Sequence, residues 1–218
     1  MLSGVSVPDA IRRGLGQAAR GAGDWCDLYR APSAETPITP ANLVLRLPAA
    51  FVALNNPRAA VGYGSAVWQG IFDAAYVQPG DYIVGGDGVF FVASITRLGP
   101  VMCVKTNRTV TLTRPAAPAM AGLTRYGGVL AAQTAPLMTA WPASVLMRQR
   151  QGGRGALPGD APGVTGGAGG WEMLLPGTAG VLLRPGDLVA DDLGRSGVLA
   201  ATELTALGWR LFARQAGT

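Results

Sequence analysis

The sequence predicts a mainly β protein, with two tandem small β-barrel or β-sandwich modules, a short N-terminal helix and a long Gly-rich loop. A turn-and-hairpin pattern occurs twice at a constant offset of 106 residues, which indicates a duplicated module. Short apolar segments bounded by Gly and Pro fill most of the chain, as is typical of strands. The 32 Gly and 16 Pro stand beside 49% hydrophobic residues, so turn-rich packed structure is favoured over disorder.

The repeated pattern is a Pro-Gly-Asp turn followed by a hairpin glycine seven residues after the aspartate, and then by a valine, Val92 or Val198. An aspartate after Pro-Gly commonly caps the turn through its side chain. We therefore interpret both aspartates as turn residues and not as acid-base groups. The structural turn residues are Pro79, Gly80, Asp81 and Gly88 in the first copy and Pro185, Gly186, Asp187 and Gly194 in the second.

The N-terminus predicts one amphipathic helix. Ser6-Val-Pro-Asp9 has the composition of a capped helix start, and Gly21 is expected to end the helix. Ile11 and Leu15 lie on one helix face. Internal glycines weaken such a helix by about 1 kcal/mol each, so the helix needs a partner surface, and Ile11 and Leu15 are candidate interface residues.

The first module is expected to span residues 25–115. For residues 50–76 a helix and a strand remain equally open, because Trp68 fits either and Gly70 favours a strand. Phe90 and Phe91 belong to a segment that is apolar on both faces, which predicts one face in the core and the other against a partner. Phe212, in the closing strand of the chain, is a third aromatic candidate for such an interface. The expected strands are 27–30, 42–47, 81–84, 89–95, 101–106 and 109–113.

The remaining boundaries follow from composition. Residues 1–24 form a helical arm, residues 116–140 an Ala/Pro-rich linker, and residues 141–218 a second β module with a mobile loop at 152–170. Trp141, Trp171 and Trp209 begin predicted strands of this module, which suits one shared core.

An alignment of the two modules adds detail to the duplication. It matches strand 28–30 with strand 144–148, and Leu47-Pro48 with Leu175-Pro176.

The chemistry available is narrow because the chain has no histidine. Triads and zinc sites that use imidazole are therefore excluded. No phosphate-loop motif occurs in the Gly-rich segment, and Cys26 and Cys103 are expected as buried free thiols. We predict no catalytic, cofactor or metal site. The alternative is a carboxylate-dependent enzyme using residues from the set Asp187, Asp191, Asp192 and Glu203.

The net charge of +5 is carried almost entirely by arginine, since Lys105 is the only lysine. The arginines are scattered except for Arg148, Arg150 and Arg154, which are the candidate DNA-facing residues. A free nucleic-acid-binding module is a further alternative, although no aromatic residues interleave this cluster. No secretion signal and no apolar run of membrane-spanning length is found, so we expect a soluble protein made in a cytoplasm, with no membrane partner.

Two segments resemble virion proteins of tailed bacteriophages and prophages. They are Val77 to Val84 with Gly88 and Phe90-Phe91-Val92, and Leu182 to Val189 with Gly194 and Trp209 to Phe212. The layout of turn, strand, Gly turn and closing strand is similar to that of head-closure and other neck proteins, which form small β-barrels.

This resemblance implies a structural, non-enzymatic role in a homo-oligomer ring at the head-tail junction, surrounding the DNA channel. Neighbouring portal, adaptor or tail proteins, and non-specific contact with packaged DNA, are the implied partners. The location would be the virion, assembled in the host cytoplasm. A tail or baseplate component of the same virion is the alternative position.

Overall fold

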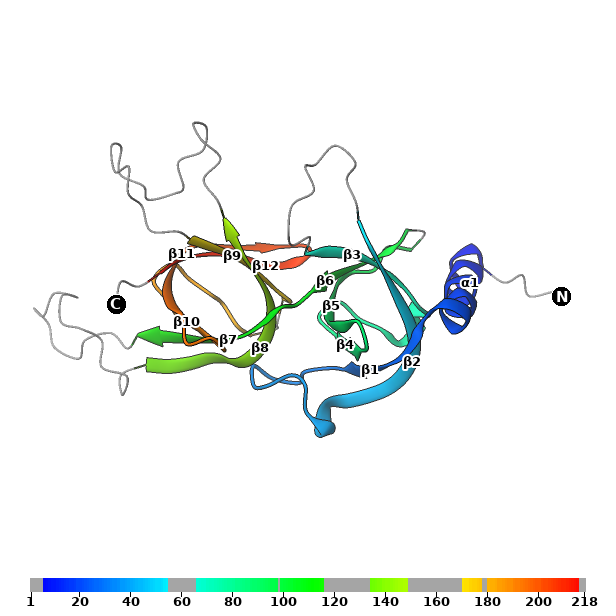
Figure 1. The fold of residues 1–218 in the computed structure, drawn as a ribbon, viewed down its shortest axis with the longest axis horizontal. Helices are drawn as coiled ribbons and strands as arrows, with labels where there is room; N and C mark the ends of the chain where they lie inside the picture. Colours follow the sequence, from blue (N-terminus) through cyan, green and yellow to red (C-terminus); the bar gives the residue numbers. More distant parts are fainter. Residues whose placement is uncertain are drawn as a thin grey trace, which may run out of the picture.

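The computed structural model describes residues 6–54, 66–97, 99–115, 134–148, 170–177 and 180–215. The chain forms two closed antiparallel barrels side by side, with one helix, α1 (Val7–Ala22), on the side of the first barrel away from the second (Figure 1). The predicted fold class is confirmed, because the protein is mainly β with two tandem barrel modules and a short N-terminal helix.

The first barrel contains strands β1 to β6 in the order β1-β2-β3-β6-β5-β4, and it closes where β4 pairs with β1. Two short 3-10 helices, η1 (Pro40–Asn42) and η2 (Ala74–Tyr76), lie in its connections. The strands are β1 (Asp24–Tyr29), β2 (Leu43–Ala53), β3 (Val67–Ile71), β4 (Tyr82–Gly85), β5 (Gly88–Ser94) and β6 (Val101–Lys105).

The second barrel repeats this topology strand for strand. Its order is β7-β8-β9-β12-β11-β10, and it closes where β10 pairs with β7. The strands are β7 (Arg108–Pro115), β8 (Thr134–Arg148), β9 (Gly170–Leu175), β10 (Leu188–Asp191), β11 (Ser196–Thr205) and β12 (Gly208–Gln215). The duplication therefore covers six strands per copy, and not only the hairpin that the sequence displays.

The structure corrects the predicted module boundary. β7 pairs with β8 and β10 of the second barrel, so the first module ends near Thr106 and not at residue 115. The C-terminal part of the predicted linker, from Thr134 onward, belongs to β8, and Gly170 begins β9 instead of ending a loop. Residues 116–133 of the linker and 152–169 of the loop lie outside the described residues.

The register also corrects the predicted correspondence between modules. Cys26 pairs with Leu47 in the first barrel, and Val110 pairs with Trp141 in the second. Leu47-Pro48-Ala49 therefore corresponds to Trp141-Pro142-Ala143, and β2 corresponds to β8. The matches of Leu47-Pro48 with Leu175-Pro176, and of strand 28–30 with strand 144–148, are wrong because β1 corresponds to β7 and β3 to β9.

Residues 50–76 are strand where the structure describes them, apart from the short connections and η2. Gly70 lies in β3, and a Cβ at this position would collide with the ring of Phe72 and approach Cys103 Sγ. The glycine is thus required by the packing of the barrel interior.

The core of the first barrel is apolar and contains both cysteines as free thiols. Burial raises the pKa of Cys103 to about 12. Phe90 lies inside this core, stacked on Phe51 with ring centroids 3.7 Å apart. Lys105 Nζ lies over the rings of Trp68 and Phe90, 5.0 and 5.6 Å from their centroids.

The two barrels share a second core. Tyr82, Phe91, Ala93 and Val104, on the outer side of the first barrel, join the buried cluster that fills the second barrel. The partner predicted for the outer face of β5 is therefore the second barrel of the same chain. The prediction of Phe90 and Phe91 as intersubunit contacts is accordingly wrong, since both are buried within the chain.

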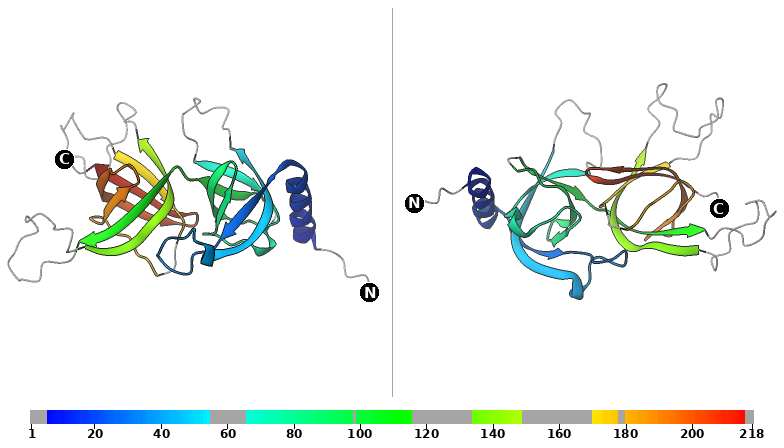
Figure 2. Two further views of the ribbon diagram at one scale, coloured as in Figure 1. Left: turned by 60° about the horizontal axis from the view of Figure 1, so that its bottom comes forward. Right: turned by 180° about the vertical axis from the view of Figure 1, so that it is seen from behind.

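Polar contacts hold this junction together. Tyr82 Oη donates to the carbonyl of Pro142 at 2.7 Å, and its ring meets Trp141 edge-on at 5.9 Å. Trp141 Nε1 donates to the carbonyl of Ala34 at 2.8 Å. Only Thr106 and Asn107 connect the barrels in sequence, and the Asn107 side chain bonds both backbone groups of Val145. Both views of Figure 2 show the two barrels side by side.

Helix α1 begins as predicted, with Ser6 as N-cap and its hydroxyl donating to Asp9 Oδ2 at 2.5 Å. It ends at Ala22 and not at Gly21, and Gly23 is its C-cap, whose N–H bonds Ala19 O before the chain enters β1. The helix packs on β2, β3 and η2 through Gly16 and Ala19. Ile11 and Leu15 are half-buried on the same face, so the barrel already provides much of the partner surface that they need.

The shared core generates a stability prediction. Tyr82→Phe removes the donor to the buried Pro142 carbonyl, and we expect a loss of about 1 to 2 kcal/mol in the free energy of unfolding. Urea unfolding followed by tryptophan fluorescence measures this loss, with the exposed Tyr76→Phe as the control. Because the barrels share a core, we expect one cooperative transition, and two separate transitions would contradict the shared core.

Candidate functional site

A buried carboxylate lies at the seam of the first barrel. Asp81 is 1% exposed, and its two oxygens accept hydrogen bonds from Arg30 Nε at 2.8 Å and Nη2 at 2.7 Å. The Gln78 N–H donates to Oδ2 at 2.7 Å, and Arg30 Nη2 also donates to Tyr76 O at 2.9 Å. Arg30 follows β1 and Asp81 precedes β4, so this Arg–Asp clasp fixes the point where β4 meets β1.

The second barrel has the same clasp at the corresponding positions. Asp187 is 2% exposed and accepts from Arg114 Nε at 2.8 Å and Nη2 at 2.9 Å. The Arg184 N–H donates to Asp187 Oδ2 at 2.8 Å, and Arg114 Nη2 donates to Leu182 O at 2.7 Å. The hydrogen bond to the aspartate raises the pKa of the guanidinium in both clasps.

Sequence reasoning missed the arginines of the clasps, although a signal was present. Each follows a buried strand leucine by two residues, as Leu28-Tyr-Arg30 and Leu112-Thr-Arg114. The two motifs are 84 residues apart while the aspartates are 106 apart. The change of offset hides the arginines from a search at one constant spacing.

The backbone of each turn is equally regular. Gly80 N–H donates to Val92 O, and Gly186 N–H donates to Leu199 O, both at 2.8 Å. The structural counterpart of Val92 is therefore Leu199 and not Val198. Gly80 and Gly186 have φ of 95° and 94°, a conformation that favours glycine. Gly88 and Gly194, in the hairpin turns, also have positive φ.

The aspartate carboxylates of the clasps are not free to act as an acid or a base. Both carboxylates are buried, and each is fully occupied by an arginine and a backbone N–H, which is the environment of a structural ion pair. Neither aspartate lines either of the two hollows described below.

The other acidic candidates do not converge on one site. Asp191 caps the β10–β11 turn, where it accepts from the N–H groups of Leu193 and Arg195 and from Arg195 Nε at 2.7 Å. Burial opposes its ionisation, but the Arg195 and backbone hydrogen bonds outweigh burial and lower the pKa of Asp191. Asp192 lines a different groove, and Glu203 is exposed on β11. Within the described ranges, no three His, Cys, Asp or Glu side chains could hold a metal ion.

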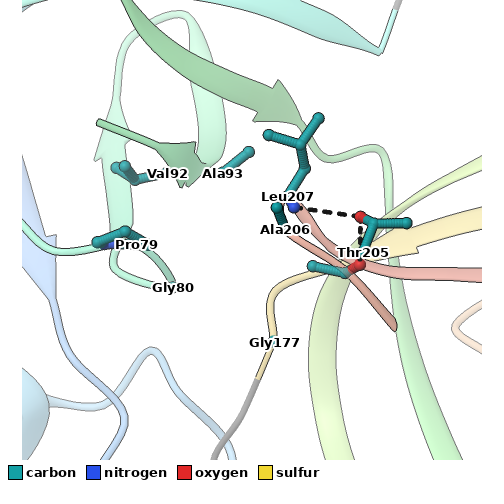
Figure 3. Close-up of a pocket in the computed structure, with 9 residues that line it drawn as sticks. Pro79, Gly80, Val92, Ala93, Gly177, Thr205, Ala206 and Leu207 are labelled. Carbon is teal, nitrogen blue, oxygen red and sulfur yellow. Dashed lines mark hydrogen bonds between the residues drawn. The ribbon is translucent and has the colours of Figure 1, made fainter. Parts of the chain in front are cut away.

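Two hollows lie between the barrels. The smaller, about 150 Å³, is bounded by Pro79-Gly80 and Val92-Ala93 on one side and by Gly177 and the turn 205–208 on the other (Figure 3). It presents backbone and small side chains with no titratable group. The larger, about 440 Å³, contains Arg108 and Asp192 among mostly neutral residues. Neither hollow is lined by a cysteine, a lysine or a histidine.

The most distinctive surface is an apolar strip on the outer side of the first barrel. Trp25 on β1 is 65% exposed, and exposed aliphatic residues lie at the two ends of β2, Leu43 and Val44 at its start and Val52 and Leu54 at and just after its end. The strip is interrupted by one ion pair, Arg46 Nε to Asp27 Oδ1 at 2.7 Å. We define the β1–β2 face as Trp25, Leu43, Val44, Val52 and Leu54.

The remaining predicted site residues lie elsewhere. Phe212 is buried on the outer side of β12, where its ring covers Gly170 of β9. It is therefore used within the chain and does not form an exposed contact. Arg148 ends β8, while Arg150 and Arg154 lie outside the described residues. A DNA-facing role for these arginines stays a prediction.

No family model, curated protein or solved structure matches this chain. No helix in the described part of the chain is both long enough and apolar enough to cross a bilayer.

The clasps give a matched pair of variants. We expect Asp81→Ala and Asp187→Ala each to lower the free energy of unfolding by about 3 kcal/mol, because breaking a buried pair leaves the arginine and the backbone N–H without an acceptor. Chemical denaturation measures both losses, with the exposed Glu203→Ala as the control. A clasp variant as stable as Glu203→Ala would contradict the assigned role.

The turn carboxylate gives a pH prediction. The folded-state pKa of Asp191 lies below its unfolded value, so its stabilisation is complete above about pH 5 and disappears as pH falls through the lower folded pKa. The stability difference between the wild type and Asp191→Asn should therefore shrink as the pH is lowered. Thermal unfolding measured across this range tests the sign, and a difference that grows in acid would contradict it.

Proposed function

We propose that this chain is a structural virion protein of a tailed bacteriophage, which assembles as a ring at the head-tail junction around the DNA channel. Its partners would be further copies of itself and a neighbouring portal, adaptor or tail protein. Its function would be assembly and not catalysis.

The observation that carries the proposal is the β1–β2 face. Its exposed residues include a tryptophan and four aliphatic side chains on a single barrel. Large exposed apolar patches mark interaction sites on protein surfaces. A protein that functions by binding other proteins would have such an exposed apolar face.

The closed interiors support the same reading. Both barrels are filled by their own side chains, and small barrels packed in this way leave no lumen for a ligand. The acidic position that the duplicated motif repeats, Asp81 in one copy and Asp187 in the other, is used in the clasps. The chain has no histidine to serve as a general base at neutral pH.

The resemblance of the hairpin segments to phage neck proteins provides the biological setting. A ring of heterologous contacts closes on itself and buries one apolar face per subunit. Positive net charge of +5 is compatible with a channel through which DNA passes, since such attraction needs no base readout.

Quantitative mass spectrometry of purified particles tests the proposal. We expect peptides of this chain in intact virions, at a constant low copy number relative to the major head protein. Deletion of the gene should give filled heads that do not join tails, and a plasmid copy should restore joining. Absence of the chain from purified particles would overturn the proposal.

Electron microscopy of particles from the deletion mutant distinguishes a position in the neck from a position in the tail or baseplate. A neck protein leaves heads and tails unjoined, whereas a tail or baseplate component leaves joined particles that are defective further along the tail. The second outcome would keep the chain in the virion and move it away from the head-tail junction.

A further inference from the structure

We propose that the β1–β2 face is the surface on which a second copy of this chain docks, with Trp25 as its anchor. The inference rests on the proposed assembly and identifies the surface that makes it.

The duplication provides an internal comparison for Trp25. Trp25 pairs with Pro48 in the first barrel, and Thr109 pairs with Pro142 at the corresponding position of the second. The same outer row continues with Thr111 and Thr113 on β7. In the second barrel this position is a half-buried threonine that lines the larger hollow between the barrels, whereas in the first barrel it is an exposed tryptophan.

The exposure of Trp25 is costly unless a partner covers it. Its side chain is 65% exposed, and burial of a tryptophan removes up to about 250 Å² from water. Tryptophan is also the residue type most enriched among those that dominate binding energy at interfaces. Trp25 pairs with Pro48, and the exposed aliphatic residues lie toward both ends of β2, on either side of the Asp27–Arg46 ion pair.

The charge around Trp25 identifies the occupant as this chain. Asp24 and Asp27 flank it on β1, and the Asp24 carboxylate lies beside Gly86, next to Asp87 of the β4–β5 turn. With Arg46, these side chains sum to −2, which leaves +7 on the rest of the chain. The face is thus acidic on a molecule that is otherwise basic, so a second copy brings charge of the opposite sign.

The type of cation strengthens this argument. All but one of the basic side chains are arginines. Guanidinium groups pair bidentately with carboxylates and also stack on aromatic rings. An arginine from a second copy can therefore engage an aspartate of the face and the ring of Trp25 together.

The test replaces Trp25 of the first barrel with threonine, the residue at the corresponding position, Thr109, of the second barrel. Trp25→Thr should leave the fold intact, because threonine occupies the same position of the same barrel at Thr109. Leu204→Thr, at an exposed leucine on β11 of the second barrel, is the matched control. The full-length chain and both variants are compared by mass photometry and light scattering over a concentration series, with thermal unfolding as the check on folding.

We expect the wild type and Leu204→Thr to form the same oligomer, and Trp25→Thr to associate at least about tenfold more weakly. Asp87→Arg should also weaken assembly, since it reverses a charge of the face. Raising the salt concentration should weaken the wild-type contact as well.

Two outcomes overturn the inference. One is assembly of Trp25→Thr at wild-type strength. The other is a wild-type chain that stays monomeric at its highest soluble concentration. If the Trp25→Thr variant were then absent from particles that contain the wild-type chain, the face would bind another virion protein instead. Either result leaves the virion proposal standing if the chain is present in particles. Conversely, absence from particles with Trp25-dependent assembly would overturn the virion proposal alone.

Discussion

A carboxylate buried beneath an arginine closes each of the two barrels. Asp81 and Asp187 are held by Arg30 and Arg114 at the seam where the first and fourth strands of each barrel pair. A six-stranded sheet that did not close there would expose two edges, and open edges invite pairing with other chains. The clasp therefore fixes the barrel as a unit with its apolar residues inside, and every outward-facing surface takes its position from that closure.

The two copies are arranged unequally although their topology is the same. Tyr82 and Phe91, on the side of the first barrel, pack against the end of the second barrel. At the corresponding positions the second barrel has Leu188 and Val198, which are smaller. The corresponding end of the first barrel is covered by α1. The internal contact is thus complete within one chain, and an assembly would need a different surface.

The sequence predicted the fold class because period-two apolar alternation and Pro-Gly-Asp turns are local signals. It also predicted the core position of Trp141. The module boundary could not be predicted, because Thr109 to Thr113 has the same alternation in whichever barrel it lies. Only the pairing of β7 with β10 assigns it.

The candidate site was predicted less well than the fold. The two aspartates were located through their turns, whereas their arginines lie more than fifty residues earlier and share no constant spacing with them. Phe91 was interpreted as an intersubunit contact because sequence alone cannot separate a second barrel of the same chain from a second chain. Trp25 was not singled out, since its exposure depends on which way β1 faces after the barrel closes.

Lys105 has a practical consequence for studies of this protein. It is the chain's sole lysine, and its amine rests over Trp68 and Phe90 at the edge of the first barrel's core. Amine-directed cross-linkers and dyes therefore find a single side chain, already engaged by two aromatic rings. Covalent mapping of any neighbouring protein calls for reagents that target carboxylates or guanidinium groups, of which the chain has far more.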